Sequence, residues 1–360
     1  MRVCPECGIE TPHQRCPTDG RVTLDAAVLA ERDPWIDRKI ADKYVIEVRI
    51  GRGGMGSVYR ARHCDTDGLV AVKVMNAAGL NDAQAVRRFH LEAQNSAGLR
   101  HANTIHVHDF GVEDGCPYLV MEYLSGRPLS QVLIDDGPLD WRRAVHIVAQ
   151  VLKSLWEAHE HPRRIVHRDI KSHNIFVLDH AGQNDFVKVL DFGISRALES
   201  SGADTRGPIG TPWYMAPEQW RGGEIDARAD LYSVGCLLYE LLSGRPPFVV
   251  SASAGATERM AALAQKHLNE EPEPLRGYVA DDVPEGLTEL VHRLLAKDRE
   301  ERPASARAVV EALGQLSGDA SVFQPPRSMS GTHVVVEVAG VGSAADDATH
   351  ADGDRATPQT

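Results

Sequence analysis

Three side chains that could together transfer a phosphoryl group lie close together in one short segment. Asp169, Lys171 and Asn174 bring a carboxylate, an ammonium and a carboxamide near one another. Asp169 would accept or orient the proton of an attacking hydroxyl, and Lys171 would stabilise the moving phosphate. Asn174 would offer its carbonyl oxygen to Mg2+. A polar surface loop is the alternative interpretation of this segment taken by itself.

A glycine-rich segment upstream could position phosphates. Residues 44–74 alternate between apolar and polar side chains as strands do, except at Gly51, Gly53, Gly54 and Gly56. A dinucleotide-binding fold needs a helix directly after such glycines, whereas residues 57–61 have a strand pattern. The pattern therefore predicts a β-hairpin whose backbone amides can approach phosphates closely.

Lys73 lies in the middle of a second predicted strand, residues 69–74. A buried ammonium without a partner is costly, so Lys73 should have an anionic partner. A predicted helix over residues 83–99 follows, with Phe89 and Ala93 on its apolar face and Glu92 close to that face. Glu92 is the natural partner of Lys73, and a solvated glutamate is the alternative. Strands are predicted at 104–110, 118–121 and 187–190.

Composition limits the kind of protein. The chain has 360 residues, of which 42% are hydrophobic and 25% are charged, which is typical of a globular protein. Its formal net charge of −12 disfavours binding to nucleic acid. There is no signal-like start and no apolar run of about 18 residues, so we expect no membrane partner and a cytoplasmic location.

Three cysteines gather at the start of the chain. Cys4 and Cys7 have the spacing of half a zinc knuckle, and Cys16 with Asp19 has the spacing of the other half. Residues 1–24 resemble the half zinc ribbon of many bacterial signalling proteins, although Asp19 stands where a fourth cysteine is usual. His13 is a rival fourth ligand for Zn2+, and a reduced, cysteine-containing tail is the alternative. Residues 25–43 are interpreted as a linker.

The motifs of the remaining chain occur in the order of the protein kinase family. They are Gly51-x-Gly53-x-x-Gly56-x-Val58, Val70-Ala71-Val72-Lys73, Glu92, His167-Arg168-Asp169-x-Lys171-x-x-Asn174, Asp191-Phe192-Gly193 and Ala216-Pro217-Glu218. Residues 44–316 therefore resemble a protein kinase domain, of the bacterial serine/threonine branch. The resemblance implies an α+β, two-lobed fold with a mostly β N-lobe at 44–123 and a mostly α C-lobe at 124–316.

This resemblance assigns roles to individual residues. Asp169, Lys171 and Asn174 would be catalytic, and Asn174 and Asp191 would hold Mg2+. Met121 would be the gatekeeper beside the adenine of ATP. Two scaffold roles are also implied: Asp230 would brace the catalytic loop, and Glu218 would pair with Arg302. The residues assigned to ATP binding are Ile50, Gly51, Arg52, Gly53, Gly54, Met55, Gly56, Ser57, Val58, Ala71, Lys73, Glu92, Met121, Glu122, Leu124, Asn174 and Asp191.

Family members with an arginine at the position of Arg168 are typically activated by a phosphate between Asp-Phe-Gly and Ala-Pro-Glu. Thr205 is the favoured acceptor in that segment, followed by Ser200 and Ser201. A second copy of the chain would place the phosphate through transient self-association. The alternative is that Thr205 is an ordinary exposed loop residue.

Two functions are compared. The first is an ATP-dependent kinase that phosphorylates serine and threonine hydroxyls of protein substrates. The second is a pseudokinase scaffold that recruits partners through its N-terminal segment and its tail, residues 317–360. Composition predicts that this tail is disordered, with one apolar island at 334–338. Lys73, Asp169, Asn174 and Asp191, which pseudokinases commonly lose, are all present and favour the enzyme.

Overall fold

The fold is known from a computed structural model. It describes residues 2–3, 10–13, 15–18, 24–25, 33–53, 56–75, 83–180, 183–192, 212–251 and 255–318. These all belong to the first of two compact units, residues 1–326, and the second unit, residues 327–360, lies outside the described part. No helix in the described residues is long and apolar enough to span a membrane.

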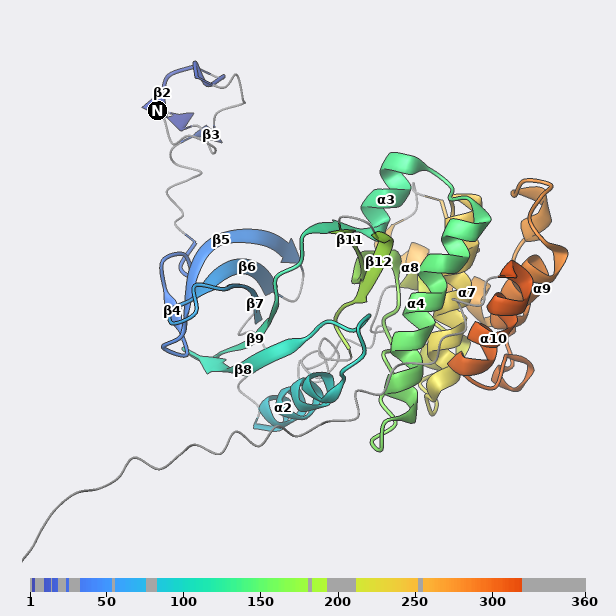
Figure 1. Cartoon of the computed structure of the whole chain (residues 1–360). Helices are drawn as coiled ribbons and strands as arrows, with labels where there is room; N and C mark the ends of the chain where they lie inside the picture. Colours follow the sequence, from blue (N-terminus) through green and yellow to red (C-terminus); the bar gives the residue numbers. More distant parts are fainter. Residues whose placement is uncertain are drawn as a thin grey trace, which may run out of the picture. The chain divides into compact units, whose positions relative to one another are not determined.

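The N-lobe is built on a six-stranded antiparallel sheet with the order β4-β5-β6-β7-β9-β8 (Figure 1). Helix α2, Ala83–Gly98, packs against β8 and β9 through Phe89 and Ala93, which are fully buried. The predicted apolar face of this helix is therefore confirmed at both positions. The strands are β4 Lys39–Ile40, β5 Tyr44–Gly53, β6 Gly56–His63, β7 Leu69–Met75, β8 Val107–Glu113 and β9 Cys116–Glu122.

Part of the predicted linker belongs to this sheet. Strand β4 pairs with β5, and its Ile40 is fully buried. Asp33 accepts a hydrogen bond from the Tyr59 hydroxyl at 3.0 Å. It also forms an ion pair with Arg49, at 2.9 Å. Residues 33–43 thus close one edge of the sheet. Residues 26–32 lie outside the described residues.

One predicted strand is displaced. The apolar pattern predicts a strand over 104–110, whereas β8 covers Val107–Glu113. Thr104 instead forms a parallel bridge with Val189, and the Ile105 amide donates to the Val189 carbonyl at 2.9 Å. The residues before β8 are therefore used to join the sheet to the C-lobe.

The C-lobe is helical, and α7 lies at its centre with thirteen buried residues. Helix α4 packs against α7 and α10, and the Asp140 carboxylate caps its start by accepting from the Arg142 amide at 2.9 Å. The α+β, two-lobed fold predicted from the motifs is confirmed. The helices are α3 Leu129–Asp136, α4 Trp141–Glu160, α6 Pro217–Arg221, α7 Ala227–Ser243, α8 Ala256–Asn269, α9 Glu285–Leu294 and α10 Ala306–Ser317.

Two small sheets complete the described elements. Strands β10 Gly126–Pro128, β11 Ile175–His180 and β12 Gln183–Val189 form an antiparallel sheet that flanks the catalytic loop. Strands β1 Arg2–Val3, β2 Glu10–Thr11 and β3 Leu24–Asp25 form another, with the order β2-β1-β3. The described residues also contain 3-10 turns at Ser172–Asn174 (η1), Pro212–Tyr214 (η2), Leu275–Gly277 (η3) and Arg299–Glu301 (η4).

Candidate active site

The three catalytic candidates come together around one carboxylate. The Lys171 ammonium lies 2.8 Å from Oδ2 of Asp169. The Asn174 amide nitrogen donates to the Asp169 carbonyl at 2.8 Å and to Oδ2 at 2.9 Å. The 3-10 turn η1, Ser172–Asn174, returns the chain so that Asn174 faces Asp169. The surface-loop alternative does not account for this convergence.

Asp230 of α7 holds the catalytic loop from beneath. Its side chain is fully buried and accepts from the His167 amide at 2.8 Å and the Arg168 amide at 2.7 Å. His159 Nε2 donates to the same carboxylate at 2.8 Å. Burial alone would raise the pKa of Asp230, but hydrogen bonding and positive charge from His159 outweigh it and lower that pKa. The predicted brace is confirmed.

Two backbone positions at the site are strained. Arg168 has φ of 67° and Asp191 has φ of 60°, both in the left-handed region that disfavours residues with a side chain. Such positions cost about 1–3 kcal/mol each and persist only where the surroundings hold them. The Asp230 carboxylate holds Arg168, and the ring of His167 bonds to the carbonyl of Leu190, next to Asp191, at 2.8 Å.

His167 also joins the catalytic loop to the Asp-Phe-Gly motif. Its fully buried side chain lies against the ring of Phe192, with centroids 4.6 Å apart. Ser96 of α2 donates to the Phe192 carbonyl at 3.1 Å. Sequence reasoning gave no role to His167, Phe192 or Ser96 because their contacts are made between segments far apart in the chain.

Lys73 contacts the predicted Mg2+ ligand Asp191. Its ammonium lies 2.7 Å from Oδ1 of Asp191, and Lys73 is only 9% exposed. Burial opposes the charge of Asp191, but the Lys73 ammonium outweighs burial and lowers the pKa of Asp191. The requirement for an anionic partner of Lys73 is therefore met by Asp191. Glu92 lies on α2 as expected, and its pairing with Lys73 stays a prediction.

The glycine-rich segment forms the predicted hairpin between β5 and β6. At Gly56, φ is 156°, and an added Cβ would lie 2.2 Å from the Val74 carbonyl oxygen, so no larger residue fits. Ile50, Gly51, Arg52 and Gly53 lie on β5, and Ser57 and Val58 lie on β6. Gly54 and Met55, at the tip, lie outside the described residues.

Four of the residues assigned to ATP binding share one apolar cluster. Ala71 and Met121 are buried in it, and Val58 and Leu124 pack against it. Glu122, next to Met121, accepts at its side chain from the His106 amide and from the Lys188 ammonium, both at 2.7 Å. These contacts fix the end of β9 beside this cluster.

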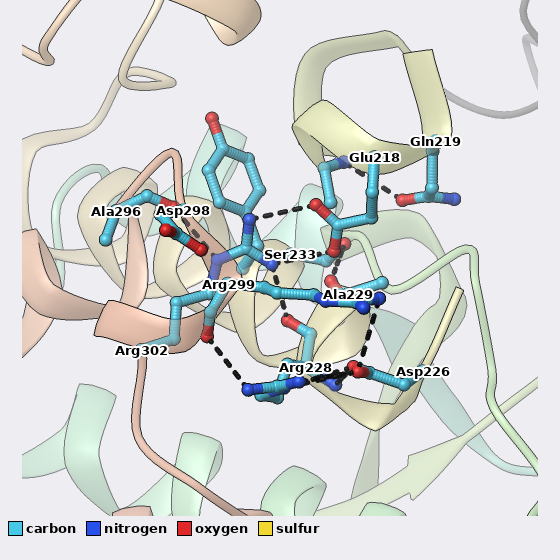
Figure 2. Close-up of polar contacts among 12 residues, drawn as sticks. Glu218, Gln219, Asp226, Arg228, Ala229, Ser233, Ala296, Asp298, Arg299 and Arg302 are labelled. Atoms are coloured by element: carbon cyan, nitrogen blue, oxygen red, sulfur yellow. Dashed lines mark hydrogen bonds and ion pairs between the residues drawn. The ribbon is translucent and has the colours of Figure 1, made fainter. Parts of the chain in front are cut away.

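A buried ion pair ties the Ala-Pro-Glu segment to the end of the domain (Figure 2). The two terminal guanidinium nitrogens of Arg302 donate to the Glu218 carboxylate, at 2.7 and 2.9 Å. Arg302 also donates to the carbonyls of Ala296 and Arg228, at 2.9 and 3.0 Å. The predicted pairing of Glu218 with Arg302 is confirmed.

Neighbouring contacts that the sequence did not indicate bring this segment to the catalytic loop. Gln219 donates to the Arg168 carbonyl at 3.0 Å. The hydroxyls of Ser172 and Tyr214 lie 3.0 Å apart, and Tyr214 also hydrogen-bonds Glu240.

Several predicted residues lie outside the described part of the chain. Gly193, Thr205 and the rest of residues 193–211 are among them, as are Cys4, Cys7 and Asp19. Cys16 is buried, and its sulfur accepts from the Thr18 amide at 3.4 Å. The described residues contain no cluster of three side chains able to hold a metal ion, and this leaves the predicted zinc site untested because most of its ligands are not among them.

A two-lobed fold with a braced Asp-Lys-Asn loop, a glycine-rich hairpin and a lysine reaching between the lobes defines a phosphotransferase of the protein kinase class. The protein kinase domain family model matches residues 44–313. The chain belongs to this family.

Known relatives agree with this assignment. Serine/threonine-protein kinase pkn3 of Myxococcus xanthus is 42% identical over 285 residues, which are 77% of this chain and 50% of that protein. Serine/threonine-protein kinase PknB of Mycolicibacterium smegmatis is 40% identical over 274 residues, 74% of this chain and 42% of that protein. The chain thus spans half or less of the length of these relatives.

Solved structures give the same fold. The PknI kinase domain of Mycobacterium tuberculosis superposes with a TM-score of 0.61 at 27% identity, covering 78% of this chain and 98% of that domain. Family membership implies use of ATP and Mg2+. The residues present fit Mg2+, because the Asp191 carboxylate and the Asn174 side-chain oxygen are the hard oxygen ligands that this ion prefers.

Proposed function

We propose that this chain transfers the γ-phosphate of ATP to serine and threonine hydroxyls of protein substrates. The observation that carries the proposal is the convergence of Lys171 and Asn174 on the Asp169 carboxylate, at 2.8 and 2.9 Å. Support for serine and threonine comes from the names of its relatives and from Lys171, two residues after Asp169.

Each side chain then has a defined task. Asp169 orients the acceptor hydroxyl and receives its proton, while Lys171 stabilises charge on the transferring phosphoryl group. Lys73, held near Asp191, positions the ATP phosphates, and the hairpin between β5 and β6 covers them. Asn174 and Asp191 would hold Mg2+, which would supply positive charge to neutralise the phosphates.

An assay of phosphoryl transfer tests this proposal. Purified chain is incubated with Mg2+, ATP labelled in the γ-phosphate and a protein acceptor rich in serine and threonine. We expect phosphoserine and phosphothreonine, loss of transfer when EDTA removes Mg2+, and loss of transfer in Lys73→Met. ATP binding without transfer under all conditions would instead favour the pseudokinase scaffold.

We also propose that a phosphate on Thr205 activates the chain, placed by a second copy during transient self-association. Support comes from Arg168, whose Nε is buried without a hydrogen-bond partner among the described residues. A phosphothreonine adds up to about two negative charges and three acceptor oxygens, which suit a guanidinium. Mass spectrometry should find this phosphate in the active chain and not in Asp169→Asn. Thr205→Ala should be less active than Ser200→Ala, and full activity of Thr205→Ala contradicts the proposal.

We propose in addition that Cys4, Cys7, Cys16 and Asp19 bind one Zn2+. Support comes from the buried Cys16 sulfur, which accepts an amide hydrogen bond, as thiolate ligands commonly do. Metal analysis of the full chain beside Asp19→Ala and His13→Ala separates the two candidate fourth ligands, and absence of zinc from the parent refutes the site. Deletion of residues 1–32 should leave kinase activity, because the contacts of Asp33 and β4 are kept.

A cytoplasmic location, where ATP and protein substrates are present, completes the proposal. Fractionation of cells that produce the full-length protein tests it.

A further inference from the structure

Asp33 lies before Tyr44, the first residue that the protein kinase family model matches, yet its carboxylate is bound to the N-lobe sheet. The Tyr59 hydroxyl lies 3.0 Å from each oxygen of this carboxylate, and the Arg49 guanidinium donates to Oδ2 at 2.9 Å. The Trp35 amide donates to Oδ1 at 3.1 Å. Burial raises the pKa of Tyr59, so its hydroxyl keeps its proton and donates. With 9% of its side chain exposed, Asp33 is held in one position by these donors.

The two side chains that reach Asp33 come from neighbouring strands. Arg49 of β5 and Tyr59 of β6 lie directly opposite each other in the sheet, and β5 and β6 run side by side in Figure 1. The register shifts between Arg49 and Gly51, and Gly51 then pairs with Val58. One carboxylate therefore bridges β5 and β6 at the base of the glycine-rich hairpin, where the register shifts.

This bridge lies on the face of the sheet away from α2. Tyr59 is 2% exposed and belongs to an apolar cluster of strand residues against which Trp35 packs. The preceding residue, Val58, packs on the other cluster, which contains Phe89 of α2 and residues assigned to ATP binding. Successive residues of a strand point to opposite faces of the sheet. Asp33 thus acts on a nucleotide beside Val58 through the backbone of β5 and β6.

The segment that follows Asp33 is fixed to β5, so the carboxylate has a firm support. The Asp37 amide donates to the Ile46 carbonyl, and the Ile46 amide donates to the Arg38 carbonyl, both at 2.9 Å. The Arg38 guanidinium lies over the ring of Trp35, 5.0 Å from its centroid. These contacts place Asp33 at a set position relative to β5, and its bond to Tyr59 extends that constraint to β6.

We propose that Asp33 is a positioning residue for ATP, because it fixes the base of the hairpin that would cover the phosphates. The inference rests on the proposed function, in which the hairpin between β5 and β6 performs that task. A loop already held near its bound conformation loses less freedom when the ligand binds, so its affinity is higher. The domain that binds ATP accordingly begins at Asp33, before the matched residues 44–313.

Direct measurement of nucleotide affinity tests this role without relying on phosphoryl transfer. Calorimetry gives the Kd of ATP with Mg2+ for the full chain, Asp33→Ala, Tyr59→Phe and the double variant. A hydrogen bond to a charged group is typically worth about a tenfold change in an equilibrium constant, so we expect Asp33→Ala to raise Kd by about that factor. Tyr59→Phe should raise Kd less, and the double variant should bind ATP as Asp33→Ala does. In transfer assays, KM for ATP should rise in Asp33→Ala while kcat at saturating ATP stays near the parental value.

Glu47→Gln is the matched control, because Glu47 also joins β5 to β6 through ion pairs, with Arg60 at 2.8 Å and Arg62 at 2.7 Å. Its Kd for ATP should equal that of the parent. A parental Kd in Asp33→Ala, or an equal rise in Glu47→Gln, overturns the proposal. If Asp33→Ala does not fold, Asp33→Asn, which keeps the shape of the side chain, replaces it, and a parental Kd in that variant overturns the proposal equally. Absence of ATP binding by the parent would instead contradict the proposed function.

Discussion

At the scale of single residues, the catalytic loop depends on one carboxylate that takes no part in the chemistry. Asp230 accepts two consecutive backbone amides, those of His167 and Arg168. The second amide belongs to a residue with a strained backbone, with φ of 67°. Loss of either acceptor bond should let the loop relax and displace Asp169.

Asp230→Asn tests this dependence. Asparagine has nearly the same shape but one acceptor oxygen instead of two, so one amide loses its partner. A displacement of about 1 Å at a reacting group can cost about a hundredfold in rate. We expect kcat to fall by about that factor while circular dichroism stays that of a folded protein. A folded variant with parental kcat would contradict the role of Asp230.

His267 should make stability depend on pH. It is fully buried in α8, with its Nδ1 2.8 Å from the Tyr232 hydroxyl. Burial, assisted by the charge of Lys297, lowers the pKa of His267 from 6.5 to about 3. Between these two values the unfolded chain binds more protons at this position than the folded chain, so stability rises with pH.

From pH 7 to pH 5 this group alone should remove about 2 kcal/mol from the free energy of unfolding. Glutamine in His267→Gln can keep a hydrogen bond to Tyr232 but does not titrate. Between pH 7 and pH 5 the free energy of unfolding of this variant should therefore fall by about 2 kcal/mol less than that of the parent protein. Urea unfolding of both proteins at the two pH values measures the difference. An equal fall in the free energy of unfolding in both proteins would show that His267 does not contribute to the pH dependence of stability.

The close approach of the proposed catalytic side chains could be predicted from sequence, because the residue types and their spacing are those that phosphoryl transfer requires. Asp169, Lys171 and Asn174 lie close in the chain, so their convergence requires only a short turn. The contacts of His167 with Phe192, and of Ser172 with Tyr214, could not be predicted in this way. They depend on how distant segments pack, and nothing in the local pattern indicates them.

At the scale of elements, α6 is attached to the segment before α10 by Glu218 and Arg302. Arg302 is 4% exposed and Glu218 is 9% exposed, so both charges are largely shielded from water. Glu218→Gln leaves the guanidinium without a countercharge and should cost about 3–5 kcal/mol of stability.

Glu218→Leu combined with Arg302→Met removes both charges together. Residues in direct contact are usually coupled by about 0.5–3 kcal/mol, so the double variant should be destabilised by less than the sum of the two single variants. Thermal and urea unfolding of the parent, Glu218→Leu, Arg302→Met and the double variant complete this double-mutant cycle. Strict additivity would mean that the two side chains do not stabilise each other.

Elements were predicted where local pattern and packing agree. The hairpin β5–β6, strand β7 and helix α2 follow from alternation and helical periodicity, and all three occur. The presence of β4 and the bounds of β8 differ from the prediction because pairing with distant segments, and not the local pattern, determines them. Residues 39–40 are too few to give a strand pattern, and residues 104–105 bond to Val189 instead of continuing β8.

At the scale of the whole kinase domain, contacts between the two lobes bring the parts of the site together. Lys73 of the N-lobe sheet contacts Asp191 of the C-lobe, and Ser96 of α2 bonds to Phe192. The carbonyl and amide of Val189 bond to residues 105 and 103. The groups proposed to position the nucleotide and to activate the hydroxyl are thus held in fixed positions relative to each other, as transfer between two bound substrates requires.

The most direct test of this account is the rate of phosphoryl transfer by Asp169→Asn, measured with saturating ATP, Mg2+ and a protein acceptor. Asparagine keeps the shape of the side chain but cannot take the proton of the hydroxyl. We predict that ATP binding is retained and that kcat falls by about a hundredfold to ten-thousandfold. Transfer by the purified variant at the parental rate, with other kinases excluded, would contradict the assignment of Asp169 and with it the proposed mechanism.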